Sequence, residues 1–325
     1  MNFILSEMTF LRYFIPLVIE GNKRNIKSNF YWYPSNKYNC PRKNMQELIN
    51  LSNKFNFNLF EISKLQDTQD LTFLVEGVGL DYVKSKNTVS LTCNIDYNAL
   101  YPRYKDKVKH IIFPSKYFTE QKISYKGKCA VFDSDNISCL GSPKYDVEID
   151  GCRAKSKFNL NDNDKYCTII LPKLRDAKSI NFNVIIKSLK TLGYKIIAKN
   201  RAKEGYSFQE ADININDEYW FPHSTMDLIH ISDLVITFGS LAIKECLMLK
   251  TKIINFDVKP FKLLPELYTG NFCVDIKDKN YTEDDLIRYH SLLQNINNFQ
   301  FDEYIKKYMF PPNSSKRILD HCQSV

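Results

Sequence analysis

The chain has 325 residues, a length that suits two domains better than one α/β layer. Hydrophobic residues make up 44% of it and charged residues 25%, as in an ordinary globular protein. The formal net charge of +8 comes from scattered lysines, which suits either an anionic ligand such as a nucleotide or a surface that only confers solubility. Zinc-finger spacing, a heptad zipper and basic aromatic repeats are all missing from the sequence, so nucleic acid is not expected as a partner.

The first half of the chain alternates short apolar runs with helical patterns. Residues 1–21 are apolar but interrupted by Glu7 and Arg12, and the longest clean run is far shorter than the roughly 20 residues of a membrane span. We therefore expect a first strand and helix of a cytoplasmic protein, with peripheral contact to a membrane left open. Strands are expected at 2–5, 29–33, 58–62, 71–77, 88–92, 110–114 and 129–133, and helices at 9–20 and 44–55.

The polar segment 148–166 has little pattern and is the best candidate for a linker. Beyond it, apolar runs without strict alternation are separated by helical patterns, which indicates a parallel sheet covered on both faces. Strands are expected at 167–172, 194–199, 234–238 and 252–256, and helices at 179–193, 223–232 and 241–250. The tail predicts two short helices broken at Pro311 and Pro312. We therefore expect domains at 1–155 and 156–300, and C-terminal helices at 301–325.

Nine cysteines occur, an odd number, and none forms a C-x-x-C pair. Several lie in apolar runs, which favours buried, reduced thiols over a disulfide framework. The five histidines are dispersed, so no metal site is expected, and no cofactor is implied.

Ligands of an open parallel sheet bind outside the carboxyl ends of the strands, so the residues that follow each strand are the candidates. In the second half, four successive connections carry cationic or hydrogen-bonding groups. They are Lys173 and Arg175, then Lys199 and Arg201, then His223, Ser224 and Thr225, and finally Gly239 and Ser240. Together they predict an anion site at one edge of the sheet.

The stretch SDLVITFGSLAIKECLML carries the sharpest signal. Gly239 allows close backbone approach, and Ser240 is expected to cap a helix whose first N–H groups would face a phosphate. Glu245 lies five residues after Ser240, about 7.5 Å along a helix at 1.5 Å per residue. A carboxylate there could accept from both hydroxyls of a ribose, although it could also point to solvent beside Lys244.

A strand, a Gly-Ser turn, a helix with a glutamate and a further strand resemble the nucleotide-binding half of GT-B-fold glycosyltransferases. UDP-N-acetylglucosamine 2-epimerases and CDP-glycerol glycerophosphotransferases share this pattern. The resemblance covers about residues 140–325, with LGSPKYD near the domain boundary and CTIILPKLRD at the first strand of the second domain. It implies an α/β fold of two Rossmann-like parallel-sheet domains facing a cleft, with C-terminal helices crossing back onto the first domain.

The resemblance also implies an enzyme that transfers a sugar from a UDP- or CDP-linked donor to a hydroxyl-bearing glycan or lipid-linked acceptor, without a metal. The diphosphate would lie on the turn and the ribose on Glu245. Glu7, which follows the first candidate strand, and Glu76, which ends another, are the candidates for a general base. A nucleotide-sugar epimerase, a CDP-alditol phosphotransferase and a non-catalytic nucleotide-sugar-binding protein remain alternatives.

Overall fold

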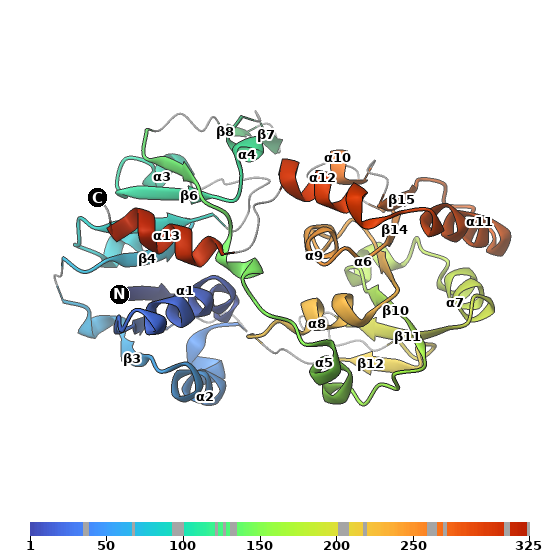
Figure 1. Cartoon of the computed structure of the whole chain (residues 1–325), viewed down its shortest axis with the longest axis horizontal. Coiled ribbons are helices and arrows are strands. Elements are labelled where there is room, and N and C mark those ends of the chain that lie inside the picture. The colour runs from blue at the N-terminus through green and yellow to red at the C-terminus, as the bar shows by residue number, and fades with distance from the viewer. Residues whose placement is uncertain are drawn as a thin grey trace. The chain divides into compact units, whose positions relative to one another are not determined.

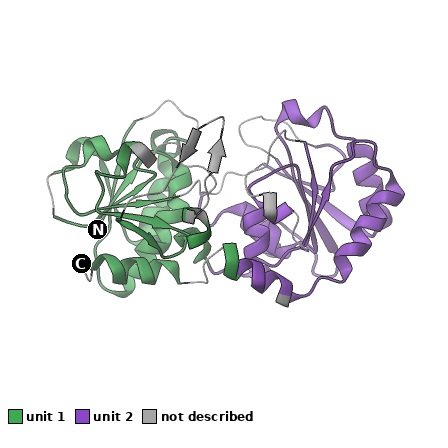
Figure 2. Ribbon diagram, turned by 90° about the horizontal axis from the view of Figure 1, so that it is seen from above, with its two compact units in different colours: residues 1–147, 306–325 green, residues 148–305 purple. Residues whose placement is uncertain are grey.

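The chain forms two compact units, each built on a parallel sheet (Figure 2). The computed structural model describes residues 1–34, 39–66, 69–92, 101–120, 123–125, 128–130, 135–200, 208–216, 220–258, 265–268, 272–308 and 313–323. Unit 1 comprises Met1–Val147 and Lys306–Val325, and unit 2 comprises Glu148–Ile305. Both termini lie in unit 1.

Unit 1 holds a seven-stranded parallel sheet in the order β3-β2-β1-β4-β5-β6-β9. Its strands are β1 (Asn2–Leu5), β2 (Asn29–Trp32), β3 (Asn58–Glu61), β4 (Thr72–Val75), β5 (Thr88–Leu91), β6 (His110–Phe113) and β9 (Ile137–Cys139). The first six occupy predicted positions. The strand expected at 129–133 overlaps β8 (Lys128–Ala130), which pairs antiparallel with β7 (Ile123–Tyr125) in a separate two-stranded sheet and so lies outside the parallel sheet; residues 131–133 are not among the described residues.

Stacked phenylalanines join the sheet of unit 1 to its first helix. Phe3 lies between Phe30 and Phe73, with ring centroids 4.8 and 5.2 Å away, and Phe14 of α1 (Leu11–Lys23) lies 5.1 Å from Phe3. These rings are fully buried, so they supply much of the apolar area that stabilises the unit. The remaining helices before residue 148 are α2 (Met45–Phe55), α3 (Tyr101–Tyr104) and α4 (Lys116–Glu120), with short 3₁₀ helices η1 (Met8–Phe10), η2 (Pro41–Asn44), η3 (Ile62–Lys64), η4 (Leu80–Tyr82) and η5 (Pro143–Tyr145).

The C-terminal segment returns to unit 1. After α12 (Asn298–Tyr308), helix α13 (Ser314–Gln323) packs along α1 (Figure 1). Arg24 at the end of α1 pairs with Asp320 of α13 at 2.8 Å, and the Ser314 N–H donates to Asp146 at 3.0 Å. Long-range polar contacts therefore fasten the last helix to the beginning of the chain.

Unit 2 holds a six-stranded parallel sheet in the order β12-β11-β10-β13-β14-β15. Its strands are β10 (Lys165–Ile170), β11 (Tyr194–Lys199), β12 (Ile213–Ile215), β13 (Leu234–Thr237), β14 (Ile253–Phe256) and β15 (Cys273–Ile276). Its helices are α5 (Gly151–Lys157), α6 (Leu174–Ala177), α7 (Phe182–Thr191), α8 (Ser224–Ile231), α9 (Ile243–Met248), α10 (Pro265–Tyr268) and α11 (Glu283–Gln294).

The segment expected to be a linker contains a helix. Asp150 caps α5 by accepting from the backbone N–H groups of Cys152 and Arg153, and α5 packs on α8 through the buried Ala154. Its polar residues are the solvent face of a short amphipathic helix, which a search for long apolar patterns overlooks.

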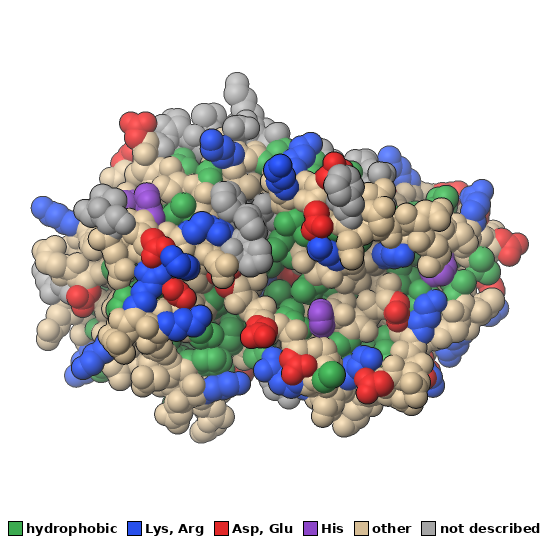
Figure 3. All heavy atoms as spheres, viewed as in Figure 1, with side chains coloured by type: hydrophobic (Ala, Val, Ile, Leu, Met, Phe, Trp, Pro, Cys, Tyr) green, Lys and Arg blue, Asp and Glu red, His purple; other side chains and the backbone are tan. Residues whose placement is uncertain are grey.

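Surface charge is mixed on the face shown in Figure 3, where Lys and Arg side chains lie among Asp and Glu. Within the described part of the chain, every helix falls short of the length and apolarity needed to cross a bilayer.

The cysteines Cys40, Cys167, Cys246, Cys273 and Cys322 are buried, and burial raises the pKa of the Cys322 thiol to about 12.

Candidate functional site

In unit 2, the strand order reverses between β10 and β13, which lie side by side in the sheet. Such a switch point opens a crevice outside the carboxyl ends of the two strands, where open α/β sheets bind ligands. Lys173 follows β10 and is exposed, whereas Gly239 and Ser240 follow β13. Three predicted residues are thus brought to one location by neighbouring strands.

Polar side chains of the neighbouring strands hold the Gly239–Ser240 turn in place by hydrogen bonds. Gly239 has a φ of 62°, a left-handed conformation that favours glycine. Its N–H donates to Asn255 Oδ1 at 2.8 Å, and Thr237 Oγ1 donates to the same oxygen at 2.8 Å. Asn255 Nδ2 in turn donates to Asp275 Oδ1 at 2.8 Å. The turn is therefore anchored across β13, β14 and β15.

Ser240 does not cap the helix, contrary to the prediction. Helix α9 begins at Ile243 with Ala242 in the N-cap position, and the Ser240 hydroxyl accepts from the Ala242 N–H at 3.2 Å. The Ile243 N–H bonds back to the Ser240 carbonyl at 3.3 Å, which also accepts from the Tyr268 hydroxyl at 3.1 Å. The left-handed glycine sends the chain through an extra turn before the helix starts.

Glu245 lies in the first turn of α9 and is only 6% exposed, and Lys244 beside it is 5% exposed. The alternative in which Glu245 points to solvent is therefore wrong. A carboxylate removed from water costs free energy unless polar or charged groups compensate it. Burial raises the pKa of the adjacent Cys246 thiol, and the charge of Glu245 raises it further.

The basic residues expected near the anion differ in exposure. The Arg175 side chain is 76% exposed and pairs with Asp176 at 3.1 Å, which places it on the surface of α6. Lys199 ends β11, the neighbour of β10, and is buried. Arg201 lies outside the described residues.

The beginning of α8 lies at the same end of the sheet, because the chain leaves the carboxyl end of β12 and must return to the amino end of β13. His223 is the N-cap residue and makes no capping hydrogen bond from its side chain. Ser224 and Thr225 are both buried inside the first turn of this helix and do not cap it. Thr225 Oγ1 lies 3.5 Å from His223 Nε2.

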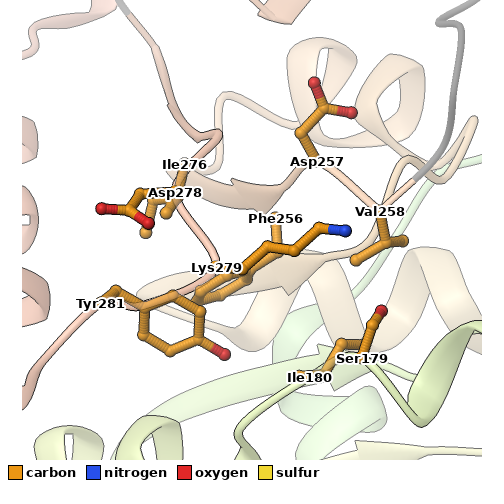
Figure 4. Close-up of a pocket in the computed structure, with 9 residues that line it drawn as sticks. All are labelled: Ser179, Ile180, Phe256, Asp257, Val258, Ile276, Asp278, Lys279 and Tyr281. Atoms are coloured by element: carbon orange, nitrogen blue, oxygen red, sulfur yellow. The ribbon is translucent and has the colours of Figure 1, made fainter.

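A shallow hollow lies at the carboxyl ends of β14 and β15 (Figure 4). Its lining combines the rings of Phe256 and Tyr281 with the carboxylates and cation of Asp257, Asp278 and Lys279. In Figure 4 the Lys279 side chain extends across the hollow toward Val258. The rings of Phe256 and Tyr281 are almost fully buried and pack against each other with centroids 4.8 Å apart, so they form the floor of a shallow depression.

In unit 1, the strand order reverses between β1 and β4, and both candidate carboxylates lie there. Glu7 follows β1, and its Oε2 accepts from Asn39 Nδ2 at 2.8 Å and from Thr9 Oγ1 at 3.3 Å. Glu76 follows β4 with a φ of 50°, and its N–H bonds to the Leu91 carbonyl at 2.9 Å. Two carboxylates predicted from separate strands thus share one edge.

Sequence reasoning did not single out the polar residues that support the two sites at the carboxyl ends of the sheets. Asn255 interrupts the apolar strand KIINF and could have been noticed as a buried amide in need of partners. Asp275 and Lys279 belong to or follow β15, a strand that was not predicted. Asn39 carries no local signal, because its role depends on contact with Glu7 across the fold.

No family model matches the sequence, and no curated protein matches it. Solved structures do match along the whole chain. UDP-GlcNAc 2-epimerase from Methanocaldococcus jannaschii has a TM-score of 0.64 at 12% identity, with 100% of this chain and 99% of that chain covered. The wall teichoic acid polymerase TagF has a TM-score of 0.64 at 14% identity, with coverages of 99% and 87%.

The chain has a GT-B fold. A third GT-B structure, the glycotransferase of kitacinnamycin, has a TM-score of 0.58 at 8% identity, with 99% of this chain and 97% of that chain covered. The prediction of a GT-B-like α/β fold is confirmed. At identities of 8–14%, the likeness establishes architecture, and the chemistry must be argued from this chain's own residues.

Proposed function

We propose that this GT-B protein is an enzyme that transfers a sugar from a nucleoside diphosphate donor to a hydroxyl acceptor during surface carbohydrate assembly. The observation that carries the proposal is the Gly239–Ser240 turn, anchored by Asn255 at the switch point of unit 2. Solved GT-B structures of the same architecture are described as bound to UDP-GlcNAc or soaked with CDPG. A nucleotide sugar is therefore the class of ligand we assign to this edge.

The donor would bind through its diphosphate and its ribose. The turn would receive the diphosphate, with positive charge from Lys173, Arg175, Lys199 and Arg201. Preorganised donors and cations of this kind stabilise negative charge that develops on a leaving diphosphate, which supports transfer without a metal.

Two further groups would complete the donor site. Glu245, buried in α9, would accept hydrogen bonds from the ribose hydroxyls. Residues His223 to Thr225 start a helix at the same edge and would line the site.

Unit 1 would supply the acceptor site and the general base. Glu7 and Glu76 lie at its switch point, and a carboxylate there could remove the proton of an acceptor hydroxyl as the sugar transfers. Glu7 is the stronger candidate, since Asn39 orients its carboxylate from 2.8 Å.

Titration calorimetry with UDP, CDP and GDP tests the donor site. At least one nucleotide should bind the wild type, and Glu245→Ala should weaken it by about tenfold or more, because hydrogen bonds to a charged group contribute roughly 1.5–3 kcal/mol. Glu283→Ala removes a partly exposed carboxylate from α11 of the same unit and should leave the affinity unchanged. A wild type that binds no nucleotide, or an unchanged affinity in Glu245→Ala, would show that the site is misassigned.

Epimerisation of the nucleotide sugar is the second candidate, favoured by the structural match to UDP-GlcNAc 2-epimerases. Incubating UDP- and CDP-linked sugars without an acceptor distinguishes the two reactions. A new epimer seen by NMR would support the second candidate, whereas consumption of donor only when an acceptor is added would support transfer. Movement of a phosphoalditol instead would indicate a CDP-alditol phosphotransferase, and binding without turnover a non-catalytic protein.

A further inference from the structure

Four aromatic side chains lie together on one face of the unit 1 sheet: Tyr31, Tyr33, Phe60 and Tyr82, here called the aromatic strip. The register pairs Tyr31 with Phe60 on β3. It pairs Phe30 with Phe3, which contacts Phe14 of α1. Because successive strand residues point to opposite faces, Tyr31 and Phe60 lie on the face away from α1.

The strip consists of two ring pairs. Tyr31 and Phe60 stack with centroids 5.5 Å apart and an interplanar angle of 27°. Tyr33 and Tyr82 lie 5.2 Å apart at 35°. Tyr31 and Tyr33 are two residues apart in an extended segment, so the pairs follow each other at about 7 Å.

Close packing of a glycine sets the position of Tyr82. Gly79 has a φ of 90°, and a Cβ built on it would lie 2.5 Å from Ile4 Cγ2 and 3.5 Å from Tyr33 Cε1. The loop therefore lies directly on β1 beside Tyr33, and the Tyr82 N–H bonds back to the Gly79 carbonyl at 3.0 Å. The second ring pair is held by the backbone and needs little ordering to meet a ligand.

The rings remain accessible in unit 1. Tyr82 is 52% exposed and Phe60 is 38% exposed. Two of the three most exposed large hydrophobic side chains described in unit 1 are thus rings of the strip, and the third is Ile49 on α2.

The strip leads to the edge that carries the two candidate carboxylates. Tyr33 directly follows β2, the neighbour of the strand that precedes Glu7. Tyr82 ends the loop that begins at Glu76 after β4. Aromatic faces contact the C–H face of a sugar ring, while carboxylates and phenol groups bond its hydroxyls.

We propose that the aromatic strip binds an oligosaccharide acceptor of at least two sugar units and directs its terminal hydroxyl toward Glu7 and Glu76. The proposal rests on the proposed function for its role in transfer, whereas glycan binding by the strip can be measured alone. It selects a glycan chain over a simple alditol phosphate, because two consecutive ring pairs match consecutive sugar rings.

Fluorescently labelled tetrasaccharides of glucose, galactose, mannose and N-acetylglucosamine provide the test, with binding to the full chain measured by fluorescence polarisation. At least one should bind the wild type, and Tyr82→Ala and Phe60→Ala should each weaken it by about tenfold. Tyr82→Phe keeps the ring and should stay within about threefold of the wild type. Ile49→Ala, a substitution of similar exposure outside the strip, should change nothing, and thermal melting confirms that each variant folds.

The outcomes separate this inference from the proposed function. If UDP or CDP binds but no tetrasaccharide does, the strip is not a glycan platform and the donor site stands. If tetrasaccharides bind through the strip but no nucleotide binds, the proposed function fails and the glycan site stands. Equal losses in Tyr82→Ala and Ile49→Ala would show nonspecific binding and would overturn the assignment.

Discussion

Replacing Asn255 with alanine should destabilise unit 2 and disturb the proposed diphosphate site together. The Asn255 side chain is fully buried and takes part in three hydrogen bonds of 2.8 Å, with Thr237, Gly239 and Asp275. Leaving a buried donor unsatisfied costs roughly 1–3 kcal/mol. The Gly239 N–H is held by the backbone and cannot turn away, whereas the Thr237 hydroxyl can rotate. We therefore expect Asn255→Ala to lower the free energy of unfolding by about 3 kcal/mol.

Urea denaturation followed by circular dichroism measures this loss, and calorimetry measures nucleotide affinity in the same samples. Asn255→Asp provides a sharper variant, because it keeps the acceptor oxygen but sets a second carboxylate against Asp275. We expect it to be destabilised as well, with part of the loss recovered at low pH as the carboxylates become protonated. Asn280→Ala, at an exposed position in the same unit, is the control. A loss below about 1 kcal/mol in Asn255→Ala, no more than one ordinary hydrogen bond contributes, would refute the view that this side chain anchors the turn.

Two further predictions concern stability in unit 2. Lys157 pairs at 2.9 Å with Asp227, which is 4% exposed. Lys157→Met should therefore lower the free energy of unfolding by about 2–3 kcal/mol in urea denaturation, because it leaves a buried carboxylate uncompensated. Lys157→Arg keeps a cation at this position and should lose less. Burial, aided by nearby lysine charges, lowers the pKa of His290 below its ordinary 6.5. The unfolded chain therefore takes up a proton more readily, so stability is fully present above about pH 6.5 and decreases as the pH falls below it. His290→Gln should therefore lose less free energy of unfolding than the wild type between pH 7.5 and 5.5. An unchanged dependence of that free energy on pH would contradict the reasoning. His230→Gln, at an exposed position, serves as the control.

The sheets could be predicted because their strands are buried on both faces and read as continuous apolar runs. LVIT in β13 and TFLV in β4 are fully buried along their length. β12 and β15 were missed because they lie at the edges of the sheet, where INI and CVDI carry polar residues and are only partly buried. A short edge strand is defined by its partner more than by its own composition.

The site was less predictable, because its geometry depends on backbone conformation and on contacts across strands. Residue type favoured Ser240 as a helix cap, yet the left-handed φ of Gly239 delays the helix until Ile243. The buried position of Glu245 also had to come from packing, since the residues around it in sequence allow either orientation. Asn255 stands out in the sequence only as a polar residue within an apolar strand, and its anchoring role could not be predicted because its three partners come from different strands or turns.

The two carboxylates of unit 1 can be separated by their effects on turnover. If Glu7 is the general base, Glu7→Gln removes proton acceptance while keeping the shape and the contacts of the side chain. Turnover of the nucleotide sugar that calorimetry selects should then fall about 10²- to 10⁴-fold, with nucleotide affinity unchanged. Asn39→Ala should give a smaller loss in kcat, since Asn39 only orients the carboxylate from 2.8 Å. Glu76→Gln, at the same edge, is the matched comparison, and a larger loss there than in Glu7→Gln would transfer the role of base to Glu76.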